Sequence, residues 1–372
     1  MKVIHLILGK ANPERMNGVN KVVHALATQQ CRAGWNAEVW GITQDVVENY
    51  PPRDFTTRLF RACRNPFQVH PELVSALTQM AGQAVVHLHG GFIPAYYSAA
   101  KKLTELGIHY VVTPHGSYSA QAMRKNGLVK QLYLRLCERH LLQGAALVHC
   151  LGQSEVTGLR GLRAGLPTCL LPYGFEMPLM EVCRTEPRGI FRVGFCGRLD
   201  EKHKGLSCLI AGFAEFAQHM PSAELWIIGD GPDREKVERW AAAVPAGKVK
   251  VLGSRFGNEK MGLLAQLDVF AHPSHYEGLP TAVLEAASLG IPCVVTEATN
   301  MGSYIRHFEC GQVVEEAQPS QLAAGLRQVY QQWINTPRQQ LSQRCHAMVT
   351  TAFYWPTLLQ EYQRMYRRAY YA

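Results

Sequence analysis

Two acidic residues, Glu277 and Glu285, stand eight positions apart across a predicted junction between a loop and a helix. Pro280 suits the first turn of a helix, because its φ is preset and its missing N–H would be unpaired there. A helix is therefore expected to begin near Leu279, with free N–H groups, including that of Gly278, forming an anion site. Carboxylates repel phosphate, so the two glutamates are expected to accept hydrogen bonds from sugar and ribose hydroxyls.

Two cations, Arg198 and Lys204, lie earlier in the chain. Arg198 follows an apolar run at residues 191–196 that predicts a strand, and Lys204 precedes Gly205 at the start of a predicted helix. A diphosphate requires cations of this kind at one place. Each of these charged residues, taken alone, is equally compatible with a solvated surface, but together they predict a nucleoside diphosphate site.

The pattern resembles a known motif. Residues 277–280 read Glu-Gly-Leu-Pro, Glu285 is followed by Ala, and residues 290–294 read Gly-Ile-Pro-Cys-Val, which is similar to the Glu-x7-Glu motif of the retaining glycosyltransferase family 4. Residues 197–200, Gly-Arg-Leu-Asp, with Lys204, resemble the diphosphate clamp of that family. The resemblance implies an α/β fold of GT-B architecture. Two doubly wound, Rossmann-like domains would face each other across a cleft, and a C-terminal helix would cross back to the first domain.

The resemblance also implies roles in the first half of the chain. Members of the family carry a His-Gly after a strand of the first domain, and this histidine hydrogen-bonds the transferred sugar. His115 with its following glycine matches that pattern. A glycine pair near the donor phosphates corresponds to Asn17 and Gly18, of which only Gly18 matches. The resemblance therefore implies His115 as a catalytic residue and Gly18 as part of the diphosphate site.

In the second half, the family binds the nucleotide base at a Gly-x-Arg-type turn, largely through backbone atoms, and Gly253, Ser254 and Arg255 resemble such a turn. We expect Glu277 to face the transferred sugar as the second catalytic residue, and Glu285 to bind the ribose. Gly278 and Leu279 are expected to join Arg198, Lys204 and Gly18 at the diphosphate.

Apolar runs alternate with helical periodicity along the chain. Strands are expected near residues 3–8, 37–42, 84–89, 110–113, 146–150, 191–196, 224–229 and 249–252. Such β-α-β alternation predicts parallel sheets that bind ligands at the carboxyl ends of their strands. The proline-rich stretch 175–189 is the expected linker, giving domains at 1–175 and 176–350 and a helix at 351–372.

Composition is that of a globular enzyme, with 372 residues, 47% hydrophobic and 18% charged. No apolar run of 18 residues is present, the start is not typical of a secretory signal, and eleven scattered cysteines suit a reducing compartment. A cytoplasmic protein is expected, at the inner face of the membrane. Residues 1–175 carry 18 Lys and Arg against 9 Asp and Glu, whereas the remainder carries 20 of each.

The basic first half favours an anionic partner. Basic and apolar residues interleave at 58–64 and 124–139, as in helices that lie on a membrane surface, although ordinary solvated helices look similar. Nucleic acid is the less favoured partner, because zinc, RNP and helix-turn-helix patterns are absent from the sequence.

His87 and His89 lie on one face of a predicted strand, a spacing compatible with a metal. No third ligand is evident nearby in the sequence, and Asp-x-Asp is absent, so we expect neither a metal nor another cofactor. Fixed cations would neutralise the leaving group instead.

The leading hypothesis is a retaining, metal-independent hexosyltransferase. It would move sugar from a nucleotide diphosphate donor, UDP-sugar before GDP-mannose, to a hydroxyl of a saccharide or lipid-linked saccharide in polysaccharide biosynthesis. The alternatives are a nucleotide-sugar epimerase of the same architecture and a non-catalytic nucleotide-sugar binder.

Overall fold

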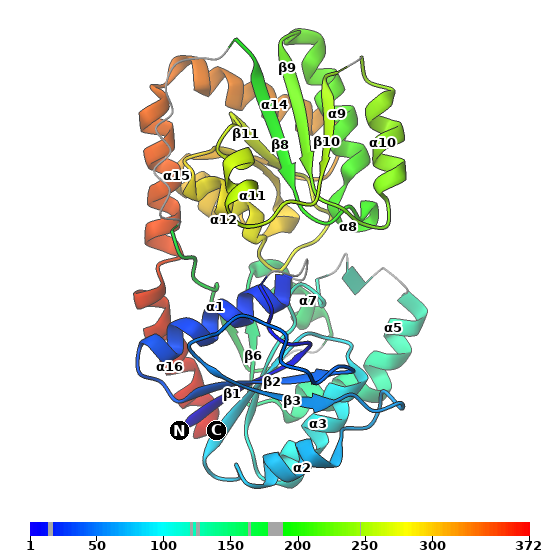
Figure 1. Ribbon diagram of the computed structural model, residues 1–372, viewed down its shortest axis with the longest axis vertical. Coiled ribbons are helices and arrows are strands. Elements are labelled where there is room, and N and C mark those ends of the chain that lie inside the picture. Colours follow the sequence, from blue (N-terminus) through cyan, green and yellow to red (C-terminus); the bar gives the residue numbers. More distant parts are fainter. Residues whose placement is uncertain (14–17, 120–121, 124–126, 163–164, 178–188, 246) are drawn as a thin grey trace. The chain divides into compact units, whose positions relative to one another are not determined.

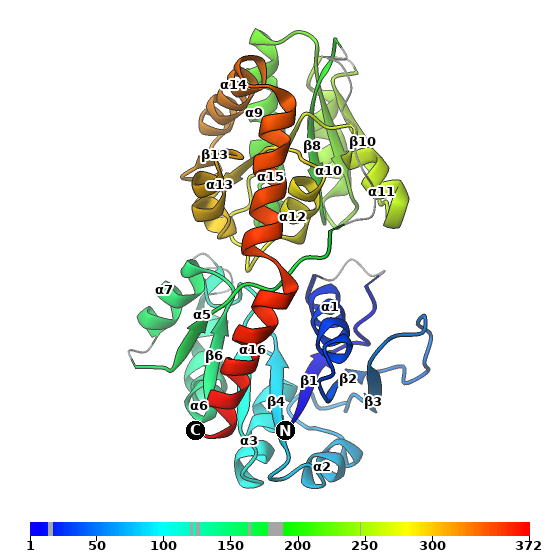
Figure 2. The same cartoon turned by 90° about the vertical axis from the view of Figure 1, so that its left-hand side faces the viewer.

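The computed structural model describes residues 1–13, 18–119, 122–123, 127–162, 165–177, 189–245 and 247–372. The chain divides into two compact units, Met1–Gly174 with Trp355–Ala372 and Phe175–Tyr354. Figures 1 and 2 show that each unit is a sheet covered by helices. Residues 178–188, most of the expected linker, lie outside the described residues.

The first unit is built on a sheet of seven parallel strands. Its order is β3-β2-β1-β4-β5-β6-β7. The strands are β1 (Lys2–Leu8), β2 (Ala37–Thr43), β3 (Thr56–Arg61), β4 (Ala84–His89), β5 (Tyr110–Thr113), β6 (Leu147–Cys150) and β7 (Thr168–Leu170). Helices cover both faces of such a sheet, so its inner strands are continuous apolar runs, which made them predictable.

Eight helical segments belong to this unit among the described residues: α1 (Gly18–Arg32), α2 (Pro71–Thr78), α3 (Pro94–Glu105), α5 (Gly127–Tyr133), the π-helical turn η1 (Leu134–Glu138), α6 (Arg139–Gly144), α7 (Gln153–Leu162) and α16 (Trp355–Tyr370). Within the stretch 124–139, whose interleaved residues predicted a helix, residues 127–139 lie on α5, η1 and the start of α6, although the π-helical turn was not predicted. The last helix, α16, packs against β4 and β5, which confirms the predicted return to the first domain.

One sequence prediction is wrong. The basic and apolar residues at 58–64 do not form an interfacial helix, because Thr56–Arg61 is the edge strand β3, paired with β2. Phe60 is buried, and the guanidinium of Arg58 lies 4.8 Å from the centre of the Trp40 ring. Arg58 and Phe60 lie two positions apart and therefore share one face of the strand, where the guanidinium also lies 5.5 Å from the centre of the Phe60 ring.

The second unit is built on six parallel strands in the order β10-β9-β8-β11-β12-β13. They are β8 (Phe191–Cys196), β9 (Ala223–Ile228), β10 (Val249–Gly253), β11 (Val269–His272), β12 (Cys293–Thr296) and β13 (Gly311–Val314). The helical segments are α8 (Glu201–Lys204), α9 (Leu206–His219), α10 (Arg234–Ala242), α11 (Gly257–Leu264), α12 (Thr281–Ser288), η2 (Glu297–Thr299), α13 (Gly302–Phe308), α14 (Pro319–Asn335) and α15 (Arg338–Ala352).

One boundary next to the acidic motif differs from expectation. Helix α12 begins at Thr281, with Pro280 as its N-cap in an extended conformation and not in its first turn. The preceding strand, β11, ends at His272. Gly278 and Leu279 therefore lie in the loop before the helix.

Both sheets reverse their strand order once, between β1 and β4 in the first unit and between β8 and β11 in the second. Chain connections leave in opposite directions there, which opens a crevice at the carboxyl ends of the two strands. Each unit therefore has its own predicted ligand position.

Candidate active site

The second unit gathers four polar side chains around Glu277, and we call these five residues the charged cluster: Lys204, Glu277, His203, His272 and Ser274. Lys204 ends α8 and forms an ion pair with the Glu277 carboxylate. The Nε2 atom of His272 and the hydroxyl of Ser274 each lie 3.0 Å from Glu277 Oε1. His203 Nε2 lies 3.4 Å from Oε2. Both oxygens of Glu277 are thus held in fixed directions.

The charge state of this cluster follows from its contacts. Burial alone would raise the pKa of Glu277, but Lys204 and the histidine hydrogen bonds outweigh it and hold that pKa well below the usual range. Burial lowers the pKa of His272, which keeps its ring neutral near pH 7. The side chains of Lys204 and Glu277 are 12% and 10% exposed, so water screens the pair weakly. The cluster presents one ionised acid and one cation.

Gly205 makes the approach of Lys204 to Glu277 possible. Its φ of 62° is in the left-handed region, and a Cβ there would lie 2.4 Å from the Pro273 carbonyl oxygen. The amide of His275 donates to the His203 carbonyl at 2.9 Å, and the rings of His203 and Tyr276 stack at 4.4 Å. The turn after α8 is therefore fastened to the loop after β11.

Asn300 orients the loop before α12, a role for which no direct signal was present in the sequence. Its amide nitrogen donates to the carbonyls of Glu277 and Gly278, both at 2.8 Å. Asn300 has a φ of 60°, a conformation that asparagine tolerates better than most residues. Thr296 also donates to the Ser274 carbonyl, at 2.5 Å. The loop is thus tied to the segment that follows β12.

Glu285 has a partner that the sequence reading missed. The amine of Lys260, on α11, donates to Glu285 Oε1 at 2.6 Å, and both side chains are 12% exposed. The two residues are 25 positions apart in the chain, so neither helical spacing nor a local motif connects them. Glu285 therefore lies on α12 with its carboxylate already paired with a cation.

The other residues of the predicted donor site lie near these elements without joining the cluster. Arg198 is exposed just after β8, and its guanidinium forms no ion pair with a described residue. Gly253 ends β10 with a φ of 71°, and its carbonyl accepts from the Gly229 amide at 2.9 Å. Arg255 donates to the Ser254 carbonyl at 2.8 Å and pairs with Glu259 at 2.7 Å.

In the first unit, His115 follows β5 and has a φ of 50°, which is rare for a residue with a side chain. The amide of the next residue, Gly116, donates to the Glu155 carboxylate, which also accepts from Leu151 at 2.7 Å. Burial raises the pKa of Glu155 to about 7 against these hydrogen bonds. Strain at a strand end, held by a buried carboxyl group, is typical of a functional position.

Gly18 is the other site residue that was predicted in the first unit. Gly18 is exposed and begins α1, without the positive φ that a tight glycine turn would need. Asn17 lies outside the described residues.

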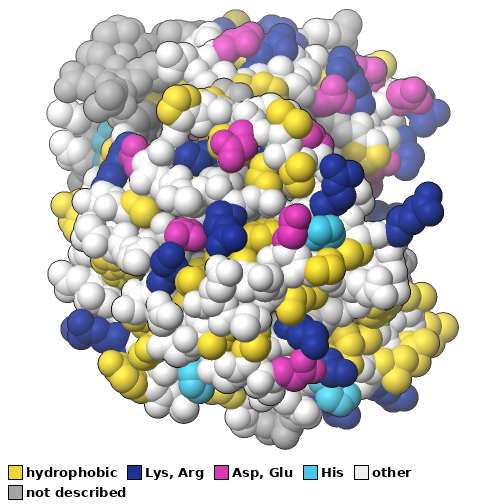
Figure 3. Space-filling model, turned by 60° about the horizontal axis from the view of Figure 1, so that its bottom comes forward, with side chains coloured by type: hydrophobic (Ala, Val, Ile, Leu, Met, Phe, Trp, Pro, Cys, Tyr) yellow, Lys and Arg dark blue, Asp and Glu magenta, His cyan; other side chains and the backbone are white. Residues whose placement is uncertain are grey.

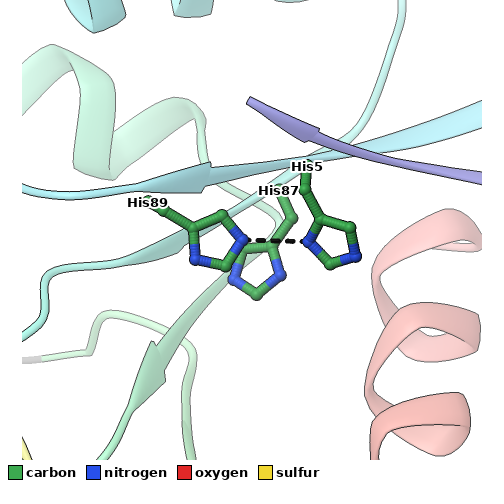
Figure 4. Close-up of side chains that lie close together, drawn as sticks. All are labelled: His5, His87 and His89. Carbon is green, nitrogen blue, oxygen red and sulfur yellow. Dashed lines mark hydrogen bonds between the residues drawn. The ribbon is translucent and has the colours of Figure 1, made fainter. Parts of the chain in front are cut away.

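Three histidines of the first unit meet in space. His5, His87 and His89 each place a ring nitrogen within 4.8 Å of the other two. Figure 4 shows the three rings on one side of the sheet, projecting from β1 and β4 beside a helix. The expectation that no third ligand lies near His87 and His89 is wrong, because parallel pairing aligns His5 with His87. Only the strand order, which the sequence does not state, connects them.

Comparisons with known proteins identify two glycosyltransferase domains in the chain. Residues 17–174 match the model described as "Glycosyl transferase 4-like domain", and residues 190–332 match "Glycosyl transferases group 1". The two domain matches, together with the fold shared with solved structures, show that the chain is a glycosyltransferase of the GT-B type. The two parallel-stranded units confirm the predicted fold.

Among curated relatives, the lipopolysaccharide core biosynthesis glycosyltransferase LpsE of Rhizobium meliloti is 28% identical over 158 residues, covering 42% of this chain and 44% of LpsE. Glycogen synthase of Mycobacterium tuberculosis (strain H37Rv) is 25% identical over 221 residues, covering 59% of this chain and 50% of the synthase. The match thus spans half or less of these relatives' own length.

Solved structures are similar over nearly the whole chain. Anabaena Alr3699/HepE in complex with UDP and glucose aligns with a TM-score of 0.73 at 19% identity, covering 98% of this chain and 99% of that one. Sucrose-phosphate synthase from Thermosynechococcus elongatus aligns with a TM-score of 0.77 at 18% identity, covering 99% of both chains. At these identities the likeness establishes the fold.

Proposed function

We propose that the protein is a retaining glycosyltransferase that moves a hexose-type sugar from a nucleotide diphosphate donor to a hydroxyl of a saccharide or lipid-linked saccharide. The observation that carries this proposal is the buried pairing of Lys204 with Glu277 at the switch point of the second sheet. A lysine held there can receive a diphosphate, and an ionised glutamate beside it can accept hydrogen bonds from sugar hydroxyls.

The reaction breaks the bond between the anomeric carbon and the donor phosphate oxygen and forms a bond from that carbon to the acceptor oxygen. In the retaining reaction the acceptor proton passes to the departing phosphate on the same face. Lys204 and Arg198 would stabilise the charge that develops on the diphosphate. Gly18, Gly278 and Leu279 would contribute at the phosphates, and His115 and Glu277 would hold the transferred sugar.

At the nucleotide end, Glu285 would accept hydrogen bonds from the ribose, in a direction set by Lys260. Gly253, Ser254 and Arg255 would contact the base. UDP is the favoured nucleotide, since the structural relative HepE is described in complex with UDP and glucose. GDP-mannose comes next, because another relative is named a GDP-mannose-dependent alpha-mannosyltransferase.

We also propose that transfer needs no metal or other cofactor, because fixed cations occupy the position where one would neutralise the leaving group. Turnover should persist in EDTA at the level measured without it. Loss of turnover in EDTA, restored by Mg²⁺ or Mn²⁺, would contradict this part of the proposal.

Calorimetry with UDP, GDP, ADP and CMP tests the donor site directly. We expect one nucleotide to bind clearly best and binding to weaken at least tenfold in both Lys204→Ala and Glu285→Ala. Lys236→Ala is the matched control, because Lys236 lies on α10 and pairs with Asp233 at an exposed position. Equal affinity in all variants would reject the site.

Product analysis separates transfer from its alternatives. Incubation of the protein with donor alone would yield an epimer if it is a nucleotide-sugar epimerase. A non-catalytic binder would retain the donor without producing either an epimer or a glycoside. The proposed transferase consumes the donor for synthesis only when an acceptor hydroxyl is supplied.

We propose that the acceptor side of the protein binds to the anionic inner face of the cytoplasmic membrane. Leu128, Val129, Leu132 and Leu136, on α5 and η1, are exposed by 59% to 87%. Arg135 and Arg139 are exposed on the same helical segment. Figure 3 shows hydrophobic and basic side chains together at one edge, on the side where Figure 1 places α5. Apolar side chains among cations suit an anionic lipid surface.

Vesicle sedimentation tests this surface. Binding to phosphatidylglycerol vesicles should exceed binding to phosphatidylcholine vesicles and should fall in Leu128→Ser/Leu132→Ser. Ile334→Ser, at another exposed apolar position, is the control. Unchanged binding in the double variant would reject this contact. No helix among the described residues is long and apolar enough to span a membrane.

A further inference from the structure

Two series of hydrogen bonds in the first unit, one from Leu171 to Tyr366 and one from Gln30 to His115, meet where the Gln30 side chain lies beside Tyr366. We call the two together the histidine relay, and its members in order are Leu171, His149, Thr113, His87, Tyr366, Gln30, His5, His89 and His115. All of its histidines except His115 are at most 3% exposed. Burial lowers the pKa of His5 and His149 to about 4 and of His115 to about 3, and holds those of His87 and His89 well below their usual value. The five rings are therefore neutral near pH 7.

A neutral imidazole has one donor nitrogen and one acceptor nitrogen, so one fixed end orients the whole series. The Leu171 carbonyl can only accept, and it lies 2.7 Å from His149 Nε2, which must therefore carry the proton. His149 Nδ1 then accepts from the Thr113 hydroxyl at 2.7 Å. The Thr113 oxygen in turn accepts from His87 Nε2 at 2.6 Å.

The next steps pass through the last helix. His87 Nδ1 has no proton and accepts from the Tyr366 hydroxyl at 2.7 Å. The Tyr366 oxygen can then only accept from its other neighbour, the Gln30 side chain. The structure shows no hydrogen bond at this step, because the Gln30 amide nitrogen has no hydrogen-bond partner among the described residues. The donor requirement nevertheless directs the amide nitrogen to Tyr366 and the amide oxygen to His5.

The amide oxygen of Gln30 accepts from His5 Nε2 at 2.7 Å. His5 Nδ1 is consequently an acceptor for His89 Nε2 at 3.0 Å, the contact drawn in Figure 4. By the same rule His89 Nδ1 accepts from His115 Nε2 at 3.1 Å. No described residue hydrogen-bonds to the Nδ1 atom of His115.

We propose that the histidine relay sets His115 as the Nε2–H tautomer and leaves its Nδ1 as an unprotonated acceptor. Gln30, His5, His89, Tyr366, His87, Thr113 and His149 are thus positioning residues for His115. The consequence for catalysis rests on the proposed function, in which His115 contacts the transferred sugar. A bare Nδ1 accepts a hydrogen bond from a sugar hydroxyl, whereas it repels the lone pairs of an anionic oxygen.

The same contacts argue against a metal among His5, His87 and His89. Both ring nitrogens of each histidine already have a hydrogen-bond partner. A cation would have to break the bond between His5 and His89 and displace Thr113 or Tyr366 from His87. None of the relay members carries a carboxylate that would offset the charge of a bound cation.

Two-bond ¹H–¹⁵N correlation spectra of the full-length, ¹⁵N-histidine-labelled protein at pH 7 test the proposal. Signals are assigned with His115→Gln and His149→Gln. We expect His115 to show a protonated Nε2 and a bare Nδ1. A protonated Nδ1, a charged ring or a mixture of tautomers in the wild-type protein would overturn the proposal without any variant.

Tyr366→Phe tests the transmission along the relay. If the Tyr366 hydroxyl directs the Gln30 amide as proposed, its removal allows the amide to turn over, and the spectrum of His115 should become a mixture of both tautomers. Tyr362→Phe removes another buried hydroxyl of α16 and should leave the His115 signals unchanged. Unchanged His115 signals in a folded Tyr366→Phe variant would show that the tautomer is set elsewhere.

Zn²⁺ is the second probe. Its addition should leave the signals of His5, His87 and His89 in place, and coordination shifts in these three rings would overturn the relay. The spectra require neither donor nor turnover. A failed tautomer prediction therefore leaves the transferase proposal standing, and an absence of transfer activity leaves the tautomer result standing.

Discussion

The two units use the same sheet topology to hold opposite kinds of polar group. Both place side chains beside the carboxyl ends of strands at a reversal of strand order. In the first unit these are neutral histidines that bond to one another. In the second unit they are an ionised glutamate and a lysine. The fold fixes where polar groups gather, and the neighbouring side chains decide whether they carry charge.

The difference in charge gives the two positions different capabilities. In the first unit burial lowers the pKa of each relay histidine. These histidines are therefore uncharged, and their hydrogen bonds run in one fixed direction from donor to acceptor. In the second unit Lys204 outweighs burial at Glu277 and preserves the ion. A directed acceptor suits a hydroxyl, and a fixed cation suits a diphosphate. This contrast is tested by experiments that disturb the neutral histidines of the first unit and leave the ion pair of the second unit intact, or the reverse.

The largest expected effect is selective acid unfolding of the first unit. Its five relay histidines have folded pKa values below the unfolded value, so their contribution to stability is present above pH 6.5 and is lost as pH falls toward 4. Glu277 has a depressed pKa, and its contribution is lost only below about pH 4.5. Hydrogen exchange followed by mass spectrometry at pH 7, 6, 5 and 4 should show first-unit peptides losing protection first. Simultaneous loss in both units would contradict the contrast.

Next in size is the loss of the fixed cation. Lys204→Met should reduce turnover by about 10²- to 10³-fold, as removal of a preorganised group at a developing charge does. Lys236→Met, with its exposed amine removed from α10, should change turnover less than twofold. Steady-state assays with saturating donor measure both. A reduction below about fivefold in Lys204→Met would place the leaving-group charge elsewhere.

A third effect belongs to Glu155, whose pKa is raised by burial, in contrast with the lowered pKa values of the relay histidines. Since its folded pKa is about 7, its neutral form favours the folded state at low pH, and that advantage is lost as pH rises from about 4.5 to 7. Relative to Glu155→Gln, the wild-type protein should lose roughly 3 kcal/mol of stability over this range. Denaturant unfolding at pH 5, 6, 7 and 8 measures the difference. A difference that does not vary with pH would mean that Glu155 stays ionised.

The smallest effect is expected at Lys260. Lys260→Met removes the cation that pairs with Glu285, so nucleotide binding should weaken by about fivefold, within the range for partly exposed ion pairs. Calorimetry with the best nucleotide measures this, and Lys250→Met, which removes an amine paired with Glu224, is the control. Tighter binding in Lys260→Met would mean that the lysine competes with the ribose for Glu285.

Much of this arrangement was predictable because local signals carried it. Buried parallel strands are apolar runs, so β4, β5 and β8 were predicted with their observed bounds. Lys204 and Glu277 follow such strands, and the carboxyl ends of parallel strands meet at one edge. Contacts between residues far apart in the chain were not predicted, because only the tertiary structure brings them together. Lys260 and Asn300 approach the acidic loop from other elements, and His5 looked like one polar residue in an apolar strand until pairing placed it beside His87.

Helix α16 determines when the first unit can finish folding. Residues near the beginning of the chain, Gln30 and His5, depend on Tyr366 close to its end, and the segment Trp355–Ala372 belongs to the first unit. During synthesis the first sheet can form early, but its buried polar series remains open until the final helix leaves the ribosome. Only a chain translated through residue 366 can therefore finish the unit with which it began.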